Sequence, residues 1–519
     1  MRHFAGLLFS VLVSFAAVAG ETPVAGRFSL EDVYAPVVAT RGMVVTEEEL
    51  ATDVGVAILR RGGNAVDAAV AVGLALAVVL PEAGNIGGGG FMLVHLAAGG
   101  RTVAIDYREV APLGAQRDMY LAADGSVDHA ELDHGAKSIG VPGTLAGLDH
   151  VLRAYGTLDW KELIEPAIEL AHDGYVLNAT QAASLAMGRE RLLRNEEARR
   201  VFMGPDGQSP AMGSRRRSPD LARTLKALRR DGVAAFYQGA LGERVVADVQ
   251  RLGGVLASED LRAYRVVERE PVTGEYRGYH IVSMPPPSSG GVHLVQMLNI
   301  LEGYPLGAMG LDSAASVHLM CEAMRRAYAD RSRYLGDPDF VRVPVAELTS
   351  KAYAASLRAG IDPLRATPSE EVKPGELAPY ESPQTTHFSV MDRWGNAVAN
   401  TYTLNWSFGS GIVARGTGIL LNNEMDDFSA KPGEPNIYGL IGGEANAVAP
   451  RFHHQWWPDE LLVEKIFSPD TIAVLRRRGH HVRSTSPIGT TQSILYWDGL
   501  YQGAADPRRG GGKAGGLQQ

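Results

Sequence analysis

The sequence predicts an α/β fold, because helical and strand-like patterns alternate along its 519 residues. Residues 64–80 are rich in Ala, Val and Leu on nearly all sides, which is typical of a buried helix, and residues 145–261 are mainly helical with glycine stops. Residues 91–96 have the apolar character of a strand. Residues 385–391 and 397–404 alternate as strands on either side of a polar turn, which predicts a β-hairpin.

The composition is that of an ordinary soluble globular protein, with 45% hydrophobic and 21% charged residues. The net charge is −9 and the sequence contains no stripe of Lys and Arg, which argues against nucleic acid as a partner. Two short arginine runs, at residues 215–217 and 476–478, are interpreted as solvated helix ends or loops.

Residues 1–19 have the pattern of a secretory signal peptide. A basic start precedes an apolar run over residues 4–17, and Ala17 and Ala19 provide the small residues of a cleavage site. The run is too short for a stable membrane span. We therefore expect an exported protein, periplasmic or secreted, with no membrane span after signal removal.

Neither a disulfide nor a metal site is expected. The single cysteine, Cys321, cannot form an internal disulfide and lies in a helical pattern, so we expect it to be buried. The histidine pairs at residues 453–454 and 480–481 show neither H-E-x-x-H spacing nor a neighbouring cysteine cluster. We interpret these histidines as structural or surface residues.

The glycine-rich residues 84–90 follow a predicted helix and precede a predicted strand. A phosphate-binding loop needs the opposite order, so that the phosphate meets a helix N-terminus, and no Lys-Ser/Thr follows here. The sequence therefore argues against nucleotide binding. These glycines allow either close backbone approach or positive φ angles.

Residues 276–284 are predicted to form a strand, followed by a rigid turn over residues 285–291 and a helix over residues 292–301. The turn contains Ser288 and Ser289, but they lack the G-x-S-x-G context of a serine nucleophile. We interpret them as turn residues.

Residues 363–384 carry five prolines among charged residues, which predicts an extended, exposed and poorly packed linker. The linker ends directly before Thr385, the first residue of a predicted strand. A threonine hydroxyl needs a base, and the α-amine of an N-terminal threonine, with a pKa of about 7.7–8.0, can serve as one. The chain would have to cut itself before Thr385. A common proline-rich loop before a strand explains the same pattern.

The residues around this position, Gln384-Thr-Thr-His-Phe-Ser-Val390, resemble the processing site of the γ-glutamyltransferases. Further strings that resemble this family lie at residues 85–91, 106–109, 284–291, 334–340, 401–405 and 418–427. The resemblance implies an αββα four-layer sandwich of the N-terminal-nucleophile hydrolases and no metal or organic cofactor. It also implies a precursor that becomes a heterodimer of a large subunit, residues 20–384, and a small subunit, residues 385–519.

The resemblance also implies the roles of individual residues. Thr385 would be the nucleophile and Thr403 would hydrogen-bond its hydroxyl. The substrate's α-carboxylate would bind Arg108, which suits a guanidinium fork, and its α-ammonium would bind acceptors on neighbouring segments. These acceptors are Asn405, Glu424 and Asp427. Tyr438 would lie on a lid over the site, and the bond between Gln384 and Thr385 would be cut.

The sequence departs from the family after Asn446. There the family carries a Ser-Ser pair that contacts substrate and a Pro-Gly-Gly-Ser stretch whose amides form the oxyanion hole, and neither occurs after Thr385 in this chain. Loss of one oxyanion donor typically lowers the rate by about 10²–10³-fold. The absent stretch would also contain core strands and a helix, so part of the core is expected to be deleted.

Three functions follow from these observations. The first is autoprocessed γ-glutamyl transfer or hydrolysis of glutathione and other γ-glutamyl amides, with water, an amino acid or a peptide as acceptor. Loss of the oxyanion segment would impair this activity. The second is an inactive, unprocessed remnant of the family. The third is a related β-lactam side-chain acylase, which does not need a pocket for a zwitterion.

Overall fold

The computed structural model describes residues 36–372, 385–427, 452–465, 467–485, 488–506, 508 and 510–518. The predicted signal peptide, Gln384 and Tyr438 lie outside these residues. Within the described ranges, no helix has the length and apolar character needed to cross a membrane.

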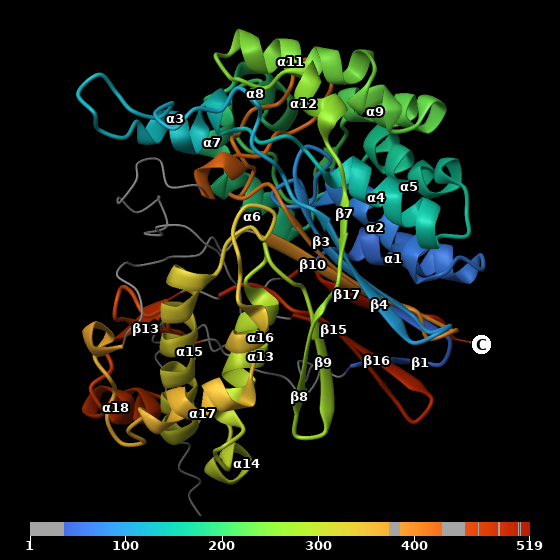
Figure 1. Ribbon diagram of the computed structural model, residues 1–519. Helices are drawn as coiled ribbons and strands as arrows, with labels where there is room; N and C mark the ends of the chain where they lie inside the picture. The colour runs from blue at the N-terminus through green and yellow to red at the C-terminus, as the bar shows by residue number, and fades with distance from the viewer. Residues whose placement is uncertain are drawn as a thin grey trace, which may run out of the picture. The chain divides into compact units, whose positions relative to one another are not determined.

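A seven-stranded antiparallel sheet with the order β17-β2-β10-β11-β3-β4-β7 forms the centre of the fold (Figure 1). Its strands are β2 (Gly42–Thr46), β3 (Gly89–Leu96), β4 (Arg101–Tyr107), β7 (Val267–Arg269), β10 (Thr385–Asp392), β11 (Ala397–Thr403) and β17 (Lys513–Gly516). β10 and β11 form the predicted hairpin, and Asp392 closes its turn by accepting hydrogen bonds from the amides of Trp394 and Asn396. The hairpin therefore occupies the middle of the sheet, with strands from earlier in the chain on both sides.

Helices cover one face of this sheet (Figure 1). They are α1 (Glu49–Arg60), α2 (Ala65–Val79) and α4 (Thr144–Tyr155), with α5 (Trp160–Asp173) packed behind α2. Every residue of α2 is buried, as its all-round apolar pattern predicts. Asp67, the one charged residue in α2, belongs to a capping box with Asn64 and also accepts a 2.6 Å hydrogen bond from the Thr157 hydroxyl.

The remaining elements lie around this core. The helices are α3 (His129–His134), α6 (Ala179–Met187), α7 (Arg189–Leu193), α8 (Glu196–Phe202), α9 (Pro219–Asp231), α10 (Ala234–Tyr237), α11 (Ala240–Arg251), α12 (Ser258–Ala263), α13 (Gly290–Leu301), α14 (Leu306–Met309), α15 (Ala314–Tyr334), α16 (Val345–Leu348), α17 (Lys351–Ala359) and α18 (Pro469–Arg477). The short strands are β5 (Tyr175–Val176), β6 (Arg215–Arg216), β8 (Val272–Tyr276), β9 (Tyr279–Ser283), β12 (Phe452–His453), β13 (Leu461–Glu464) and β14 (Val482–Thr485). Cys321 is buried in α15, as predicted.

A second, three-stranded sheet packs on the other face of the large sheet, against β2 and β10. Its strands are β1 (Val37–Ala39), β16 (Leu500–Ala505) and β15 (Gln492–Trp497). Met43, Val45 and Tyr501 pack between the two sheets. In the described residues, no helix packs extensively on the outer face of this sheet, where Leu495 and Trp497 are 55% and 70% exposed. The predicted α/β fold, with helices and two packed sheets, is confirmed.

The small sheet covers only part of the large one. Beside it lies a hollow of about 320 Å³, lined by residues that include Leu93, Met391, Ala399 and Ile494. The side chains of β10 alternate between fully buried on the helical side and half-buried on this side.

The strand predicted over residues 276–284 is confirmed as β9, Tyr279–Ser283, but it begins three residues later than predicted, because Tyr276 ends a separate strand, β8. The structure has a hairpin of β8 and β9, which turns at Arg277 and Gly278 with φ angles of 50° and 85°. Two consecutive positive φ angles match the two-residue turns that join antiparallel strands. Gly278 could have indicated this turn from the sequence, because glycine readily adopts a positive φ angle.

The prediction of an exposed linker is confirmed only in part for its described residues: 363–365 and 370–371 are exposed, whereas Ala366, Ser369 and Val372 are buried. The Thr367 hydroxyl donates to Glu322 at 2.6 Å, and the amide of Ser369 donates to Asp459 at 3.0 Å. Ser369 is completely buried. A high proline content predicts an extended backbone, but it does not show whether that backbone packs against other segments. Here the hydrogen-bond acceptors, Glu322 of α15 and Asp459 after β12, come from segments distant in sequence.

Candidate active site

Strand pairing places the two predicted threonines opposite each other. Thr385 is the first residue of β10 and pairs with Thr403, the last residue of β11. Paired residues of an antiparallel ladder point to the same face, with Cα atoms about 4.5–5.5 Å apart. The Thr403 hydroxyl accepts a 2.8 Å hydrogen bond from the amide of Asn405, which fixes its orientation beside Thr385.

The glycine-rich turn before β3 supports this strand end. A Cβ atom on Gly88 would lie 2.1 Å from the carbonyl oxygen of Thr403, and one on Gly90 would lie 2.4 Å from that of Thr401. Neither glycine has a positive φ, so close approach is the reason for them. Asn85, in the same turn, donates a 2.7 Å hydrogen bond to the Thr403 carbonyl.

Arg108 and two acidic residues form an ion-paired cluster, here called the Arg108 pocket because it is the predicted substrate-binding site. Arg108 follows β4, and its guanidinium donates to the Asp427 carboxylate at 2.6 Å and also forms an ion pair with Glu424. The two acidic residues begin and end a 3₁₀ turn, Glu424–Asp427. The Asn405 side chain donates a 3.1 Å hydrogen bond to the carbonyl of Asn423, directly before this turn. The structure therefore brings together Arg108, Asn405, Glu424 and Asp427.

Glu109 is a neighbour of this pocket to which the sequence analysis gave no role. Its side chain is buried close to that of Glu424. Burial is the main cause that raises the pKa of Glu109 to about 7 and that of Glu424 to about 8, and the charge of Glu109 contributes to the raised pKa of Glu424. The signal was available, because Glu109 ends the string Asp-Tyr-Arg-Glu that contains Arg108.

These raised pKa values predict a pH-dependent stability. Between the ordinary value of 4.5 and about 7, the unfolded chain loses the proton of Glu109 while the folded chain keeps it. Folding stability therefore falls as the pH rises through this window, by about 1.4 kcal/mol for each unit of pKa shift. Glu109→Gln has no proton to lose, so its melting temperature should fall less between pH 5 and pH 8. The exposed substitution Glu347→Gln is the control, and identical profiles for wild type and Glu109→Gln would contradict the prediction.

Of the two histidine pairs, His453, His454 and His480 are buried near α15, whereas His481 is exposed. His480 is hydrogen-bonded to His318 at 2.8 Å, and His454 to Asp459 at 3.2 Å. Burial lowers the pKa of His454 to about 4, so it is neutral at ordinary pH. These contacts confirm a structural role for His454 and His480.

Comparison with known proteins adds family information. A family model described as gamma-glutamyltranspeptidase matches residues 51–451 and 444–516. A glutathione hydrolase proenzyme of Escherichia coli is 46% identical over 561 aligned positions, which cover 97% of this chain and 96% of that protein. Those positions outnumber the 519 residues of this chain, so the relative has residues with no counterpart here. The two family-model matches meet at the predicted deletion.

Two solved structures show the same fold. The gamma-glutamyltranspeptidase of Helicobacter pylori is 47% identical with a TM-score of 0.62, over 63% of this chain and 93% of that chain. The cephalosporin acylase of Bacillus halodurans is 26% identical with a TM-score of 0.82, over 97% of this chain and the whole of that chain.

Proposed function

Because this chain belongs to the gamma-glutamyltranspeptidase family, an enzyme family of γ-glutamyl transfer and glutathione hydrolysis, we propose that Thr385 is its self-exposed nucleophile. The observation that carries the proposal is the pairing of Thr385 with Thr403 beside the pocket of Arg108, Glu424 and Asp427. The chain then acts on glutathione and related γ-glutamyl amides.

In the precursor, the Thr385 hydroxyl attacks the carbonyl carbon of Gln384. The peptide bond breaks as an ester forms, and the nitrogen of Thr385 takes the hydroxyl proton. Water then hydrolyses the ester, which leaves a carboxylate on Gln384 and a free amine and hydroxyl on Thr385. This amine is the base that the threonine hydroxyl needs.

In the mature enzyme, the Thr385 amine takes the hydroxyl proton as the oxygen attacks the γ-carbonyl of the substrate. The amide bond breaks, the leaving amine takes the proton, and the γ-glutamyl group stays on Thr385 as an ester. Water or an acceptor amine then attacks the ester and regenerates the hydroxyl. Thr403 positions the nucleophile by hydrogen bonding.

The sheet explains how the two subunits stay together after cleavage. β10, β11 and β17 belong to the proposed small subunit, and they alternate in the sheet with β2 and β3 of the proposed large subunit. Three strand pairs, β17-β2, β2-β10 and β11-β3, join the two proposed subunits by backbone hydrogen bonds. The fourth pair of this region, β10-β11, lies within the small subunit. We also propose export of the precursor with removal of residues 1–19, and Tyr438 as a residue of the lid.

The charges of the pocket match an α-amino acid zwitterion. Arg108 is paired with Asp427 and Glu424 in this structure, and a γ-glutamyl substrate would exchange these contacts. The α-carboxylate of the substrate would bind the Arg108 guanidinium. Its α-ammonium would donate hydrogen bonds to the two acidic residues and to Asn405. This buried ion-pair pocket favours γ-glutamyl compounds over the side chains of β-lactams, although the fold is shared with a cephalosporin acylase.

Substrate preference tests this assignment. We expect γ-glutamyl-p-nitroanilide to exceed glutaryl-p-nitroanilide, which lacks the α-ammonium, by about 10²-fold in kcat/KM, because a charge-assisted contact in a buried site is worth about 1.5–3 kcal/mol. Asp427→Asn should lower kcat/KM for the γ-glutamyl substrate and leave glutaryl turnover nearly unchanged. Equal turnover of the two anilides by the wild type would reject the zwitterion pocket and favour an acylase.

A further inference from the structure

Arg216 contradicts the prediction of a solvated arginine run. It lies in β6, is only 7% exposed, and packs its guanidinium 4.5 Å from the centre of the Phe202 ring. Its neighbours Arg215 and Arg217 are exposed, as predicted. Alternation along a strand explains the difference, because successive side chains point to opposite faces.

The charge of Arg216 lacks an acidic partner. Its Nη1 atom donates one long hydrogen bond, 3.4 Å, to the carbonyl of Val201, and its side chain also contacts the Tyr175 hydroxyl, whereas its buried Nε atom has no hydrogen-bond partner among the described residues. Among the described residues, no carboxylate forms an ion pair with Arg216, whereas Asp220 nearby is held by Arg200 and Arg223. A buried guanidinium without a counter-charge is costly, so a compensating group is expected.

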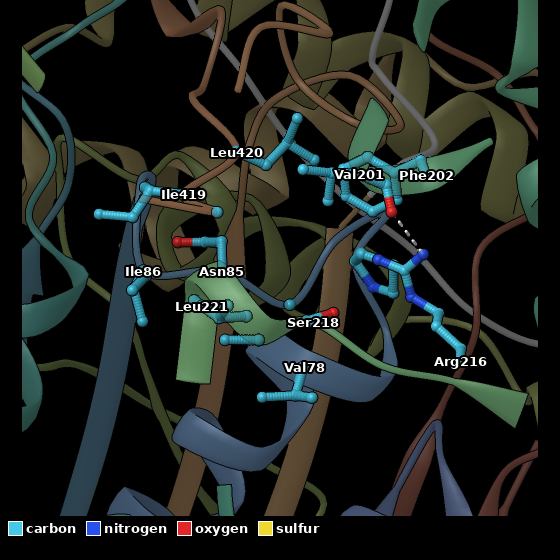
Figure 2. Close-up of a pocket in the computed structure, with 14 residues that line it drawn as sticks. Val78, Asn85, Ile86, Val201, Phe202, Arg216, Ser218, Leu221, Ile419 and Leu420 are labelled. Carbon is cyan, nitrogen blue, oxygen red and sulfur yellow. Dashed lines mark hydrogen bonds between the residues drawn. The ribbon is translucent and has the colours of Figure 1, made fainter. Parts of the chain in front are cut away.

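Arg216 lines a cavity of about 20 Å³, which is room for one small ion or one water (Figure 2). Figure 2 shows Arg216 extending toward Phe202, with Ser218 beside it. The other walls are mostly apolar and include Ile86 and Ile419. Sulfate or phosphate, with four oxygens around the central atom, is too large for this volume.

The start of α9 also borders the cavity. Ser218 is the N-cap of this 13-residue helix and lines the cavity, but its side chain makes no capping hydrogen bond. The first N–H groups of a helix carry a partial positive charge and bind anions. Pro219, the first residue of α9, has no N–H group, and the Asp220 carboxylate in the same turn is paired with Arg200 and Arg223, so Arg216 supplies the main positive charge at the cavity.

We propose that this cavity is a binding site for one monovalent inorganic anion of the size of chloride, held by Arg216, with Ser218 as a further polar lining residue. The anion would neutralise the buried guanidinium. It would also support the end of β11, because Asn85 lines the cavity and donates a hydrogen bond to the carbonyl of Thr403. The site is separate from the pocket of Arg108 and does not depend on the proposed function.

Thermal unfolding at constant ionic strength tests the proposal. We expect the melting temperature to rise by about 1–2 °C for each tenfold increase of chloride above its dissociation constant, when chloride replaces gluconate. Arg216→Met should lose this dependence, and the neighbouring exposed substitution Arg217→Met should keep it. An equal chloride dependence in Arg216→Met would overturn the proposal.

Diffraction from crystals of the unaltered protein grown in sodium bromide gives a test that does not depend on a variant folding. An anomalous peak within about 3.5 Å of the Arg216 guanidinium supports the site, since bromide and chloride share charge and chemistry. Absence of the peak, with water at this position, overturns the proposal.

Discussion

The Thr385→Ala chain is expected to run as a single band on a denaturing gel, whereas the wild type gives two fragments, the smaller of which begins with Thr385. Without the hydroxyl, no ester can form at Gln384, and without cleavage no free amine is available as a base. Hydrolysis of γ-glutamyl-p-nitroanilide should fall by about 10⁴-fold or more, toward the uncatalysed rate. N-terminal sequencing of the small fragment and initial rates provide the measurements.

The next residue along the strand offers a matched control. Thr386 is fully buried on the opposite face of β10, and its hydroxyl has no hydrogen-bond partner. Thr386→Val should leave cleavage unchanged and raise the melting temperature, because it removes an unsatisfied buried hydroxyl at nearly constant volume. Thr385→Ser keeps a nucleophile and should still be cleaved. An uncleaved wild-type chain would instead establish the inactive remnant, and cleavage of Thr385→Ala would place the nucleophile elsewhere.

Insertion of the missing segment is expected to increase turnover strongly. The Escherichia coli relative has residues with no counterpart in this chain, and the family-model matches place the break at residues 444–451. If those residues are inserted between Val448 and Ala449, kcat for γ-glutamyl-p-nitroanilide should rise by at least about 10²–10³-fold, which is the typical worth of one oxyanion donor. The effect should be on kcat more than on KM, because an oxyanion forms only in the transition state.

The same insertion should stabilise the fold. The inserted strands and helix would cover the hollow beside β15 and the exposed side chains of Leu495 and Trp497, and burial of apolar surface contributes about 25 cal/mol for each Å². A Gly/Ser-rich insertion of equal length is the control. It should raise neither kcat nor the melting temperature. If the control and the relative's segment gave the same kcat, the chain would have its own oxyanion donors.

Some of the site was predictable because its signals are local. The apolar pattern of α2, the hairpin of β10 and β11, and the position of Thr385 at the start of a strand depend on neighbouring residues only. The resemblance strings added Arg108 and Asp427, which the fold places 2.6 Å apart although they are 319 residues apart in sequence. A periodic sequence pattern relates only neighbouring residues, so it could not have predicted the contact between Arg108 and Asp427.

The sequence by itself determined the α/β class, the strand that begins with Thr385 and the family to which the residues around it are similar. Only the tertiary structure decided that Arg216 is buried beside α9, that Glu109 lies against Glu424, and that residues 363–372 are held by α15. The physical reason is the range of the interactions involved. Periodicity and turn chemistry act between neighbours, whereas burial of a charge and the pKa of a carboxyl depend on which distant segments the fold brings into contact.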